Sequence, residues 1–242
     1  MPKIEGRNPV IESLKGKRKI QEILLQKGIS GKRIKKIEKE AKLANIPLKR
    51  VSKKNLDKIS DSHSHQGVIA KAEKINLVSP EQIIEYAKDK EESPFIVILD
   101  QVQDPHNFGS IIRSAYSAGA HGLIFQERRA AGITPAVLKA SAGASEHLLL
   151  SKVTNINYTI EKLKELGVWI TGTDLNTDKY YDEVEYKGST AIVIGNEGNG
   201  LRRLVKENCD FLVKIPIKGK VDSLNASVAA GIMFYEVVRQ RR

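Results

Sequence analysis

The stretch Val221-Asp-Ser-Leu-Asn-Ala-Ser-Val-Ala-Ala-Gly231 joins an extended segment to the last predicted helix of the chain. The apolar run Phe211–Ile215, closed by a proline, precedes it, and residues 232–238 follow with apolar side chains at helical spacing. Ser223 and Asn225 stand where this helix should begin, and both residue types are good N-caps. Taken alone, the stretch predicts a short strand, a turn of small residues and a capped helix.

Two further stretches have the same form, a loop rich in Asn and Gly after a strongly apolar strand. Asp104-Pro-His-Asn-Phe-Gly-Ser-Ile-Ile-Arg113 follows Phe95–Leu99, and Gly195-Asn-Glu-Gly-Asn-Gly200 follows Ala191–Ile194. In an open α/β sheet the carboxyl ends of the strands share one crevice, so the three loops can surround a single ligand. Neither the G-x-G-x-x-G spacing of a dinucleotide fold nor a phosphate-binding G-x-x-x-x-G-K-[ST] loop is present.

In their order along the chain and in their residues, these three stretches resemble the three motifs of the SpoU or TrmH family of RNA ribose 2′-O-methyltransferases. The resemblance covers residues 94–242, and the N-terminal part is similar to the small substrate-binding domain of that family. Because of this front domain, the chain most resembles the members that methylate a guanosine ribose in bacterial 23S ribosomal RNA. The related members that act on transfer RNA are the alternative within the family.

The resemblance implies a mostly parallel α/β sheet whose C-terminal segment threads through a loop to form a trefoil knot. Knots are rare, so topology rules alone would not predict one. It also implies a homodimer formed through the knot domain, and S-adenosylmethionine held in the knot by backbone groups. By matching motif positions, the implied cofactor contacts are Thr171, Gly172, Thr173, Gly195, Ile215 and Leu224.

The candidate catalytic residues are the polar side chains that the three motifs bring together, namely Asn107, Arg113, Glu197, Ser223 and Asn225. Methyl transfer from a sulfonium to a ribose 2′-OH neutralises a cation, so it requires alignment and removal of a proton rather than a metal.

In the family, the arginine corresponding to Arg113 lies at the ribose and has been proposed as the base. Arginine stays protonated in proteins, so we expect Arg113 to clamp a phosphate and orient the 2′-OH. The proton would then leave to an RNA phosphate oxygen or to water. Glu197 is the other candidate acceptor, or it holds Arg113 in a bidentate pair.

The formal net charge of +11 is concentrated in the front of the chain. Residues 1–75 contain 20 Lys and Arg against 8 Asp and Glu, whereas residues 76–242 contain 20 against 21. This asymmetry favours a polyanion partner, and RNA fits better than a membrane because the front segment has no aromatic or leucine-rich helix face. It also has no Tyr or Phe, so we expect phosphate and shape contacts there rather than base stacking.

Three parts are predicted: an RNA substrate-binding domain over residues 1–75, a linker over 76–93 and a catalytic, cofactor-binding knot domain over 94–242. In the first part, apolar residues recur at the helical spacing in some stretches and at the strand spacing in others. This predicts a compact α/β module of the ribosomal protein L30e type. In the last part, the pattern predicts a helix over Ile111–Ala118 and a return to the sheet over Glu146–Leu150. Trp169 and Phe125 are predicted to be core residues.

Other residue types limit the possible functions. The single cysteine, Cys209, excludes an internal disulfide and a cysteine-based zinc site, and His63 with His65 forms a pair that lacks a third ligand. We therefore expect no metal. His106 either contacts substrate or is an ordinary loop residue. The absence of an apolar run of about 18 residues predicts a soluble cytoplasmic protein. A structured-RNA binder without catalysis is the alternative from another functional class.

Overall fold

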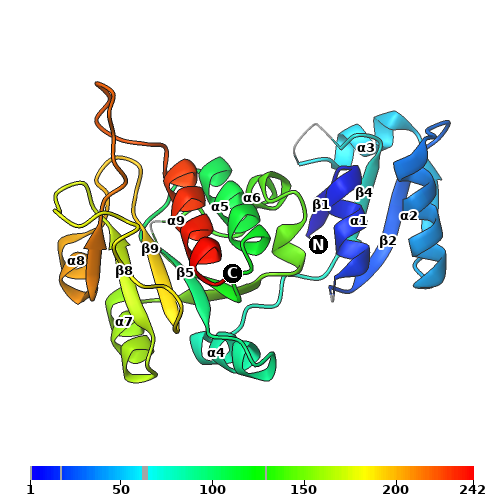
Figure 1. Cartoon of the computed structure of the whole chain (residues 1–242). Coiled ribbons are helices and arrows are strands. Elements are labelled where there is room, and N and C mark those ends of the chain that lie inside the picture. The colour runs from blue at the N-terminus through cyan, green and yellow to red at the C-terminus, as the bar shows by residue number, and fades with distance from the viewer. Residues whose placement is uncertain (1, 17, 62–64, 129) are drawn as a thin grey trace. The chain divides into compact units, whose positions relative to one another are not determined.

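The protein is described here from a computed structural model, which defines residues 2–16, 18–61, 65–128 and 130–242. The chain forms two compact units, each shown in Figure 1. Unit 1 consists of Met1–Asn76 and Ile133–His147, and unit 2 consists of Leu77–Gly132 and Leu148–Arg242. Residues 133–147, which the sequence assigned to the catalytic part, thus belong to unit 1 by their contacts.

Unit 1 is built on a four-stranded sheet with the order β1-β4-β2-β3. The strands are β1 (Lys3–Glu5), β2 (Ile20–Gln26), β3 (Leu48–Val51) and β4 (Val68–Ala72), and the helices are α1 (Arg7–Lys15), α2 (Lys32–Leu43) and α3 (Lys53–Ile59). Strand β4 is antiparallel to β1 and β2, and β3 is parallel to β2. Alternation along β2 sends Ile23 and Leu25 to the cluster with α1 and α2, and Leu24 to Leu56 of α3.

The segment 133–147 contributes α6 (Pro135–Ala140) and a 3-10 turn, η1 (Ala144–Glu146), to unit 1. Glu146 is therefore not part of a strand as predicted, and β7 begins only at Leu149. The Glu146 side chain is buried instead in an ion pair with Arg18 at 3.0 Å. Burial raises the pKa of the Glu146 carboxyl, although the Arg18 guanidinium opposes the shift.

Unit 2 contains a six-stranded sheet with the order β10-β8-β9-β5-β6-β7, in which every pairing is parallel. Its strands are β5 (Phe95–Leu99), β6 (Gly122–Gln126), β7 (Leu149–Val153), β8 (Trp169–Thr173), β9 (Thr190–Ile194) and β10 (Phe211–Val213). The predicted parallel α/β sheet is confirmed. The threading of the C-terminal segment into a knot stays a prediction.

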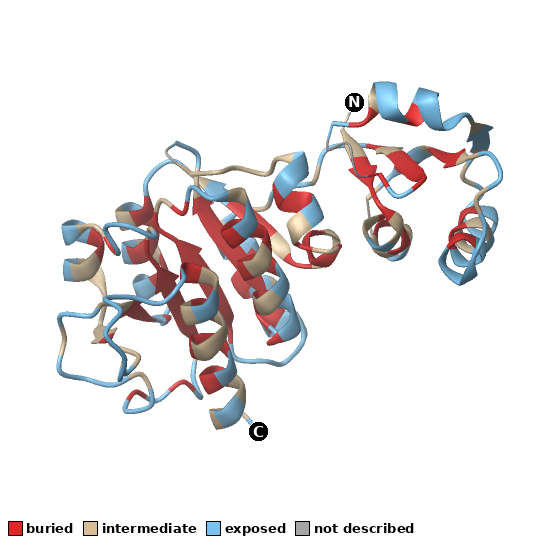
Figure 2. Ribbon diagram, turned by 90° about the horizontal axis from the view of Figure 1, so that it is seen from above, coloured by how far each residue is buried: buried red, intermediate tan, exposed pale blue. Residues whose placement is uncertain are grey.

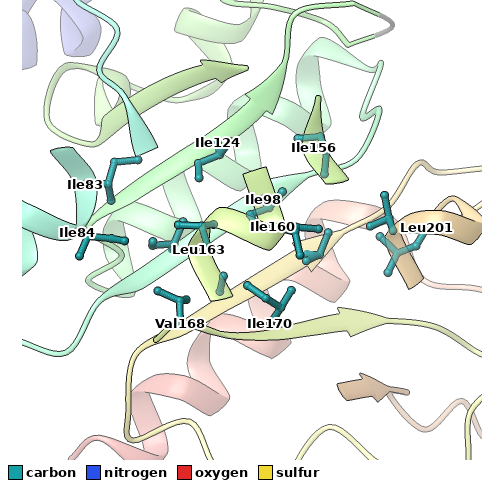
Figure 3. Close-up of a cluster of buried hydrophobic side chains, with 14 residues drawn as sticks. Ile83, Ile84, Ile98, Ile124, Ile156, Ile160, Leu163, Val168, Ile170 and Leu201 are labelled. Carbon is teal, nitrogen blue, oxygen red and sulfur yellow. The ribbon is translucent and has the colours of Figure 1, made fainter. Parts of the chain in front are cut away.

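Helices cover both faces of this sheet, and the buried strands between them are visible in Figure 2. The helices are α4 (Pro80–Asp89), α5 (Pro105–Ser117), α7 (Ile156–Glu165), α8 (Arg203–Asn208) and α9 (Ala226–Gln240). On one face, Ile98 and Ile170 pack with α4, α7 and α8 in the cluster of Figure 3. On the other face, edge-to-face ring pairs join β5 to α9 and β6 to α5, at 5.9 Å and 5.3 Å: Phe95–Phe234 and Phe108–Phe125.

The two aromatic residues predicted to be core differ in the structure. Phe125 is 1% exposed, which confirms the prediction, because β6 lies between two strands and beneath α5. Trp169 is 57% exposed, so its predicted burial is wrong. It opens β8 next to the edge strand β10, where its ring contacts Phe211 and the rest of its surface faces solvent.

Helix α5 begins at Pro105, six residues before the predicted start at Ile111. The Asp104 side chain accepts hydrogen bonds from the backbone N–H groups of His106 and Asn107, at 2.6 and 3.2 Å, and proline occupies the first helical turn. Asn107 is therefore held on the first turn of a rigid helix rather than in a loop. No helix in the described part of the chain is long and apolar enough to cross a membrane.

Candidate functional site

A cleft of about 360 Å³ lies at the carboxyl ends of β8, β9 and β10 in unit 2. Three loops line it, over residues 173–176, 194–200 and 213–226. Parallel strands bring these loops to one edge of the sheet. The sequence predicted that the loops of all three motifs meet here, but only the second and third motifs do. Residues 105–113 of the first motif lie on α5 and are not among the cleft residues, and the loop after β8 lines the cleft instead. The volume lies within the range of small-molecule sites, which is about 300–1,000 Å³.

The loop after β9 is closed by its own backbone. Asn196 and Gly200 exchange two backbone hydrogen bonds of 3.0 Å, and the Asn196 side chain accepts from the N–H of Gly198 and donates to the Gln101 carbonyl. A Cβ atom on Gly195 would lie 2.3 Å from the carbonyl carbon of Gly200. Glycine is therefore required at position 195 for the loop to fold back on itself, and its backbone also lines the cleft.

A chain of side-chain hydrogen bonds joins the three motifs. Asn107 Nδ2 donates to Glu197 Oε1 at 2.9 Å, and Asn225 Nδ2 donates to Asn107 Oδ1 at 2.9 Å. Glu197 and Asn225, which bond to Asn107 from either side, are 90 and 118 residues away from it in the sequence. Asn107 is 9% exposed, so both halves of its amide are satisfied in a place where an unpaired group would be costly.

The Asn225 side chain has a second role. It is the N-cap of α9, and its Oδ1 accepts from the backbone N–H and the hydroxyl of Ser227, at 2.9 and 2.7 Å. The N-cap interpretation of Asn225 is thus confirmed for its side-chain oxygen, while its nitrogen reaches Asn107. A catalytic role for Asn225 stays a prediction. Ser223 does not cap this helix and lines the cleft instead.

Arg113 lies on α5 six residues beyond Asn107, roughly 9 Å along the helix axis. Its side chain is exposed, and within the described residues it makes no hydrogen bond or ion pair with Glu197. The Glu197 carboxylate is occupied by Asn107 instead. His106, one residue before Asn107, is also exposed.

The structure divides the residues proposed for cofactor contact into two groups. Thr173, Gly195, Ile215 and Leu224 line the cleft. Thr171 and Gly172 are buried inside β8 and are not among the cleft residues. A Cβ on Gly172 would lie 2.6 Å from Leu201 and 2.8 Å from Cys209 Sγ, so glycine is needed here for packing. Burial raises the pKa of that Cys209 thiol to about 12.

Sequence reasoning missed an ion pair inside the cleft. Asp174 Oδ2 and Lys206 Nζ are 2.8 Å apart, both residues line the cleft, and the Asp174 side chain is only 10% exposed. Asp174 directly follows β8, in the position where the motif loops follow their strands, and this placement was an available signal. Lys206 lies on α8, where it had no feature to distinguish it from a solvated surface charge.

Sequence reasoning also missed an ion pair next to these loops, between Asp100 and Arg202. Asp100 follows β5, is 1% exposed, and accepts from the Nε and the backbone N–H of Arg202 at 2.7 and 2.9 Å. Arg202 also donates to the side chain of Gln126, the last residue of β6, at 3.1 Å. The Arg202 side chain is partly exposed, but through the buried Asp100 it ties the loop after β9 to two neighbouring strand ends.

The histidine pair proposed as an incomplete metal site is described only in part, because His63 lies outside the described residues. His65 is buried, contacts Asp57 at 2.9 Å and accepts from the N–H of Gly67. These contacts give it a structural role. Within the described ranges, no group of three potential ligands is close enough to hold a metal ion.

Comparison with known proteins identifies two matching family models. Residues 94–235 match the SpoU rRNA Methylase family, and residues 3–78 match the model described as RNA 2′-O ribose methyltransferase substrate binding. The first match contains all three motifs and more than half of the chain. The second covers residues 3–75 of the basic front segment and three residues beyond it.

Relatives cover nearly the whole chain. The "Putative TrmH family tRNA/rRNA methyltransferase YacO" of Bacillus subtilis is 43% identical over 98% of this chain and 94% of its own length. The SpoU methyltransferase AviRb from Streptomyces viridochromogenes, solved in complex with AdoMet, is similar with a TM-score of 0.83 and 26% identity, covering 99% of this chain and 90% of its own. An AdoMet-bound rRNA methyltransferase from Sinorhizobium meliloti is similar with a TM-score of 0.77 and 25% identity, covering 98% and 86%.

The pair of Asp100 and Arg202 yields a prediction for stability. Replacing Arg202 with alanine leaves a buried carboxylate without its main partner, so we expect a loss of about 3 kcal/mol in the free energy of unfolding. Arg203→Ala is the matched control, since Arg203 pairs with Glu207 in solvent and should cost less than about 0.5 kcal/mol. Urea unfolding of both variants measures the difference. Equal stabilities would show that the pair does not fix the loop.

Proposed function

Since this chain belongs to the SpoU rRNA methylase family, we propose that it methylates the ribose 2′-OH of a guanosine in 23S ribosomal RNA. The chain is an RNA 2′-O-methyltransferase that uses S-adenosylmethionine. The observation that supports the proposed site most directly is the hydrogen-bonded chain of Glu197, Asn107 and Asn225, because it joins one residue of each motif and ends at Glu197, which lines the cleft.

The cleft fits S-adenosylmethionine in size and in chemistry. Its walls combine loop backbone with the apolar side chains of Ile194, Ile215 and Leu224, a surface suited to adenine. The ion pair of Asp174 and Lys206 offers a carboxylate and an ammonium to the charged amino-acid end of the cofactor. When bound, the cofactor supplies a methyl group on a positively charged sulfur.

We assign the alignment of the ribose to the network at the cleft. Asn107 holds the Glu197 carboxylate in place from a rigid helix turn, and Ser223 presents a hydroxyl on the opposite loop of the cleft. Fixing the 2′-oxygen in line with the methyl group is the largest contribution that such a site can make, up to several kcal/mol.

The proton of the 2′-OH needs an acceptor, and among the carboxylates that line the cleft we assign Glu197, because Asn107 holds it in place. Arg113 stays a cation and cannot take the proton, so we assign it to an RNA phosphate. Its exposed side chain, free of an ion pair with Glu197, is available for that contact.

The front domain supports ribosomal RNA over transfer RNA as the substrate. Residues 1–75 contain the whole basic excess of the chain and include most of the substrate-binding match. We propose the division into residues 1–75, 76–93 and 94–242, with residues 133–147 of the last part packing on unit 1. Lysines on the exposed side of α2 then supply salt-dependent contacts to phosphates.

We also propose that the protein is a homodimer formed through the C-terminal helix of unit 2. Helix α9 exposes Val228 and Tyr235, which are 52% and 53% accessible, on either side of Gly231. Small and apolar residues on one helix suit a close interface. Sedimentation of the purified protein should give twice the chain mass of 26.9 kDa, and Val228→Glu should shift it toward the monomer. A monomeric wild-type protein would rule out this assembly.

Asn107→Ala tests the network itself. The variant removes both hydrogen bonds at the centre and leaves the Glu197 carboxylate without the contact that positions it, so we expect methyl transfer to fall about 100-fold. Cofactor affinity should stay within about twofold, because Asn107 does not line the cleft. Single-turnover transfer and calorimetric titration with S-adenosylmethionine measure the two effects. Full activity in this variant would remove the network from the mechanism.

The substrate is tested by transferring labelled methyl groups from S-adenosylmethionine to unmodified 23S RNA and, separately, to unmodified transfer RNA. We expect label in 23S RNA on the 2′-oxygen of a guanosine ribose, located by mapping the product. Arg113→Ala should abolish this label without loss of stability, since the side chain is exposed. Arg113→Lys should not restore it, because lysine lacks the planar fork of arginine.

The alternatives give different results in the same assay. Label in transfer RNA alone would keep the chemistry and overturn the 23S target. Cofactor binding without label in either RNA would favour a precursor ribosomal particle as the substrate. Absence of cofactor binding would favour a structured-RNA binder.

A further inference from the structure

The edge of the unit 2 sheet carries an exposed aromatic group that the catalytic site does not use. The rings of Trp169 on β8 and Phe211 on β10 lie 5.8 Å apart at an interplanar angle of 32°. Lys179 Nζ lies 5.0 Å from the centre of the Phe211 ring. We refer to Trp169, Phe211 and Lys179 as the edge platform. Trp169, 57% exposed, is the most prominent ring of this group.

A second ring and cation continue the edge platform toward the cleft. Tyr180 pairs with Lys214 along the edge of β10, and Lys214 Nζ lies 5.1 Å from the centre of the Tyr180 ring. Lys214 also lines the cofactor cleft. Since β10 advances about 3.3 Å per residue, only about 10 Å of strand separates Phe211 from this cleft residue.

Lys179 and Lys214 place two ammonium groups beside the rings, where they can meet phosphates. Lys179 is exposed, and its ammonium faces a ring rather than a carboxylate. Two acids are adjacent to platform residues in the sequence. Asp178, before Lys179, is exposed, whereas Asp210, before Phe211, is paired with Lys164 at 2.8 Å and accepts the N–H of Ile170. Glu183, close to Tyr180, accepts the backbone N–H of Tyr180 at 2.6 Å.

We propose that the edge platform binds unpaired bases of the RNA substrate by stacking, next to the nucleotide that enters the cleft. Exposed aromatic rings with cations beside them are the features that hold single-stranded RNA, since bases stack on the rings and phosphates meet the lysines. Unit 1 cannot supply such contacts from residues 1–75, which contain no Phe, Tyr or Trp. The platform gives the enzyme a stacking surface within its catalytic unit.

Trp169 is the only tryptophan of the chain, so its fluorescence reports on this surface alone. Titration with a single-stranded RNA decanucleotide of mixed sequence should quench the emission saturably, and added salt should reverse it. Saturation with S-adenosylmethionine alone should leave the emission nearly unchanged. RNA that binds without quenching would overturn the proposal.

Affinity measurements with end-labelled RNA complete the test. Trp169→Ala should weaken binding about 10-fold, the effect of losing one stacked base, and Lys179→Gln should weaken it a few-fold. The matched control is Tyr158→Ala, since Tyr158 is 59% exposed on α7 and also has a lysine, Lys162, over its ring. Equal affinities of Trp169→Ala and wild type, or equal losses in Trp169→Ala and Tyr158→Ala, would contradict the platform.

The proposal rests on RNA as the substrate and not on the 23S target, because binding is measured without methyl transfer. Calorimetry with S-adenosylmethionine on Trp169→Ala should give the wild-type affinity, since Trp169 does not line the cleft. A lost cofactor affinity would show that the variant disturbs the catalytic site and would overturn a separate RNA surface. Failure to label 23S RNA would leave the binding results unaffected.

Discussion

The arrangement of the catalytic unit depends on the buried amide of Asn107. It donates to Glu197 and accepts from Asn225, so one side chain sets the positions of two loops that are distant in sequence. A carboxylate only accepts hydrogen bonds, which fixes the direction of the whole chain of bonds. Because the amide is nearly inaccessible to water, displacement of either loop would leave a buried polar group unpaired. The network therefore stabilises the cleft in one form.

This constraint works because the strands beneath it are rigid. Strands β5 and β9 are completely buried and pair in parallel along five residues, so the loops that follow them start from fixed points. The pair of the buried Asp100 and the partly exposed Arg202 then holds the start of α8 to the end of β5. Gly195 and Gly172 give the same region its close approaches, one within a loop and one between a strand and its neighbours. The packing of the strands and the polar contacts between the loops thus both restrict the shape of the cleft.

Much of this was predictable from sequence, for physical reasons that differ by residue. Apolar runs bounded by Asn and Gly predicted the parallel strands and the loops at their carboxyl ends. The resemblance of the three motifs to those of the SpoU or TrmH family predicted the cofactor and the reaction. The sequence misplaced Trp169 because an apolar strand does not reveal whether it lies beside the sheet edge. It misplaced Glu146 because the partner that buries it, Arg18, is 128 residues away. Pairings of this kind depend on tertiary contacts that local pattern does not encode.

The distribution of charge and aromatic residues implies a division of labour in RNA recognition. The front segment is rich in lysine and has no Phe, Tyr or Trp, so we expect its contacts to supply affinity and orientation rather than stacking. The catalytic part has almost no net charge, and its exposed rings lie on the sheet that also carries the cleft. Stacking of an unpaired base on a ring is worth about 1–3 kcal/mol, and the rings of the edge platform can supply it within the unit that carries the cleft. Lysines of the front segment supply phosphate contacts instead.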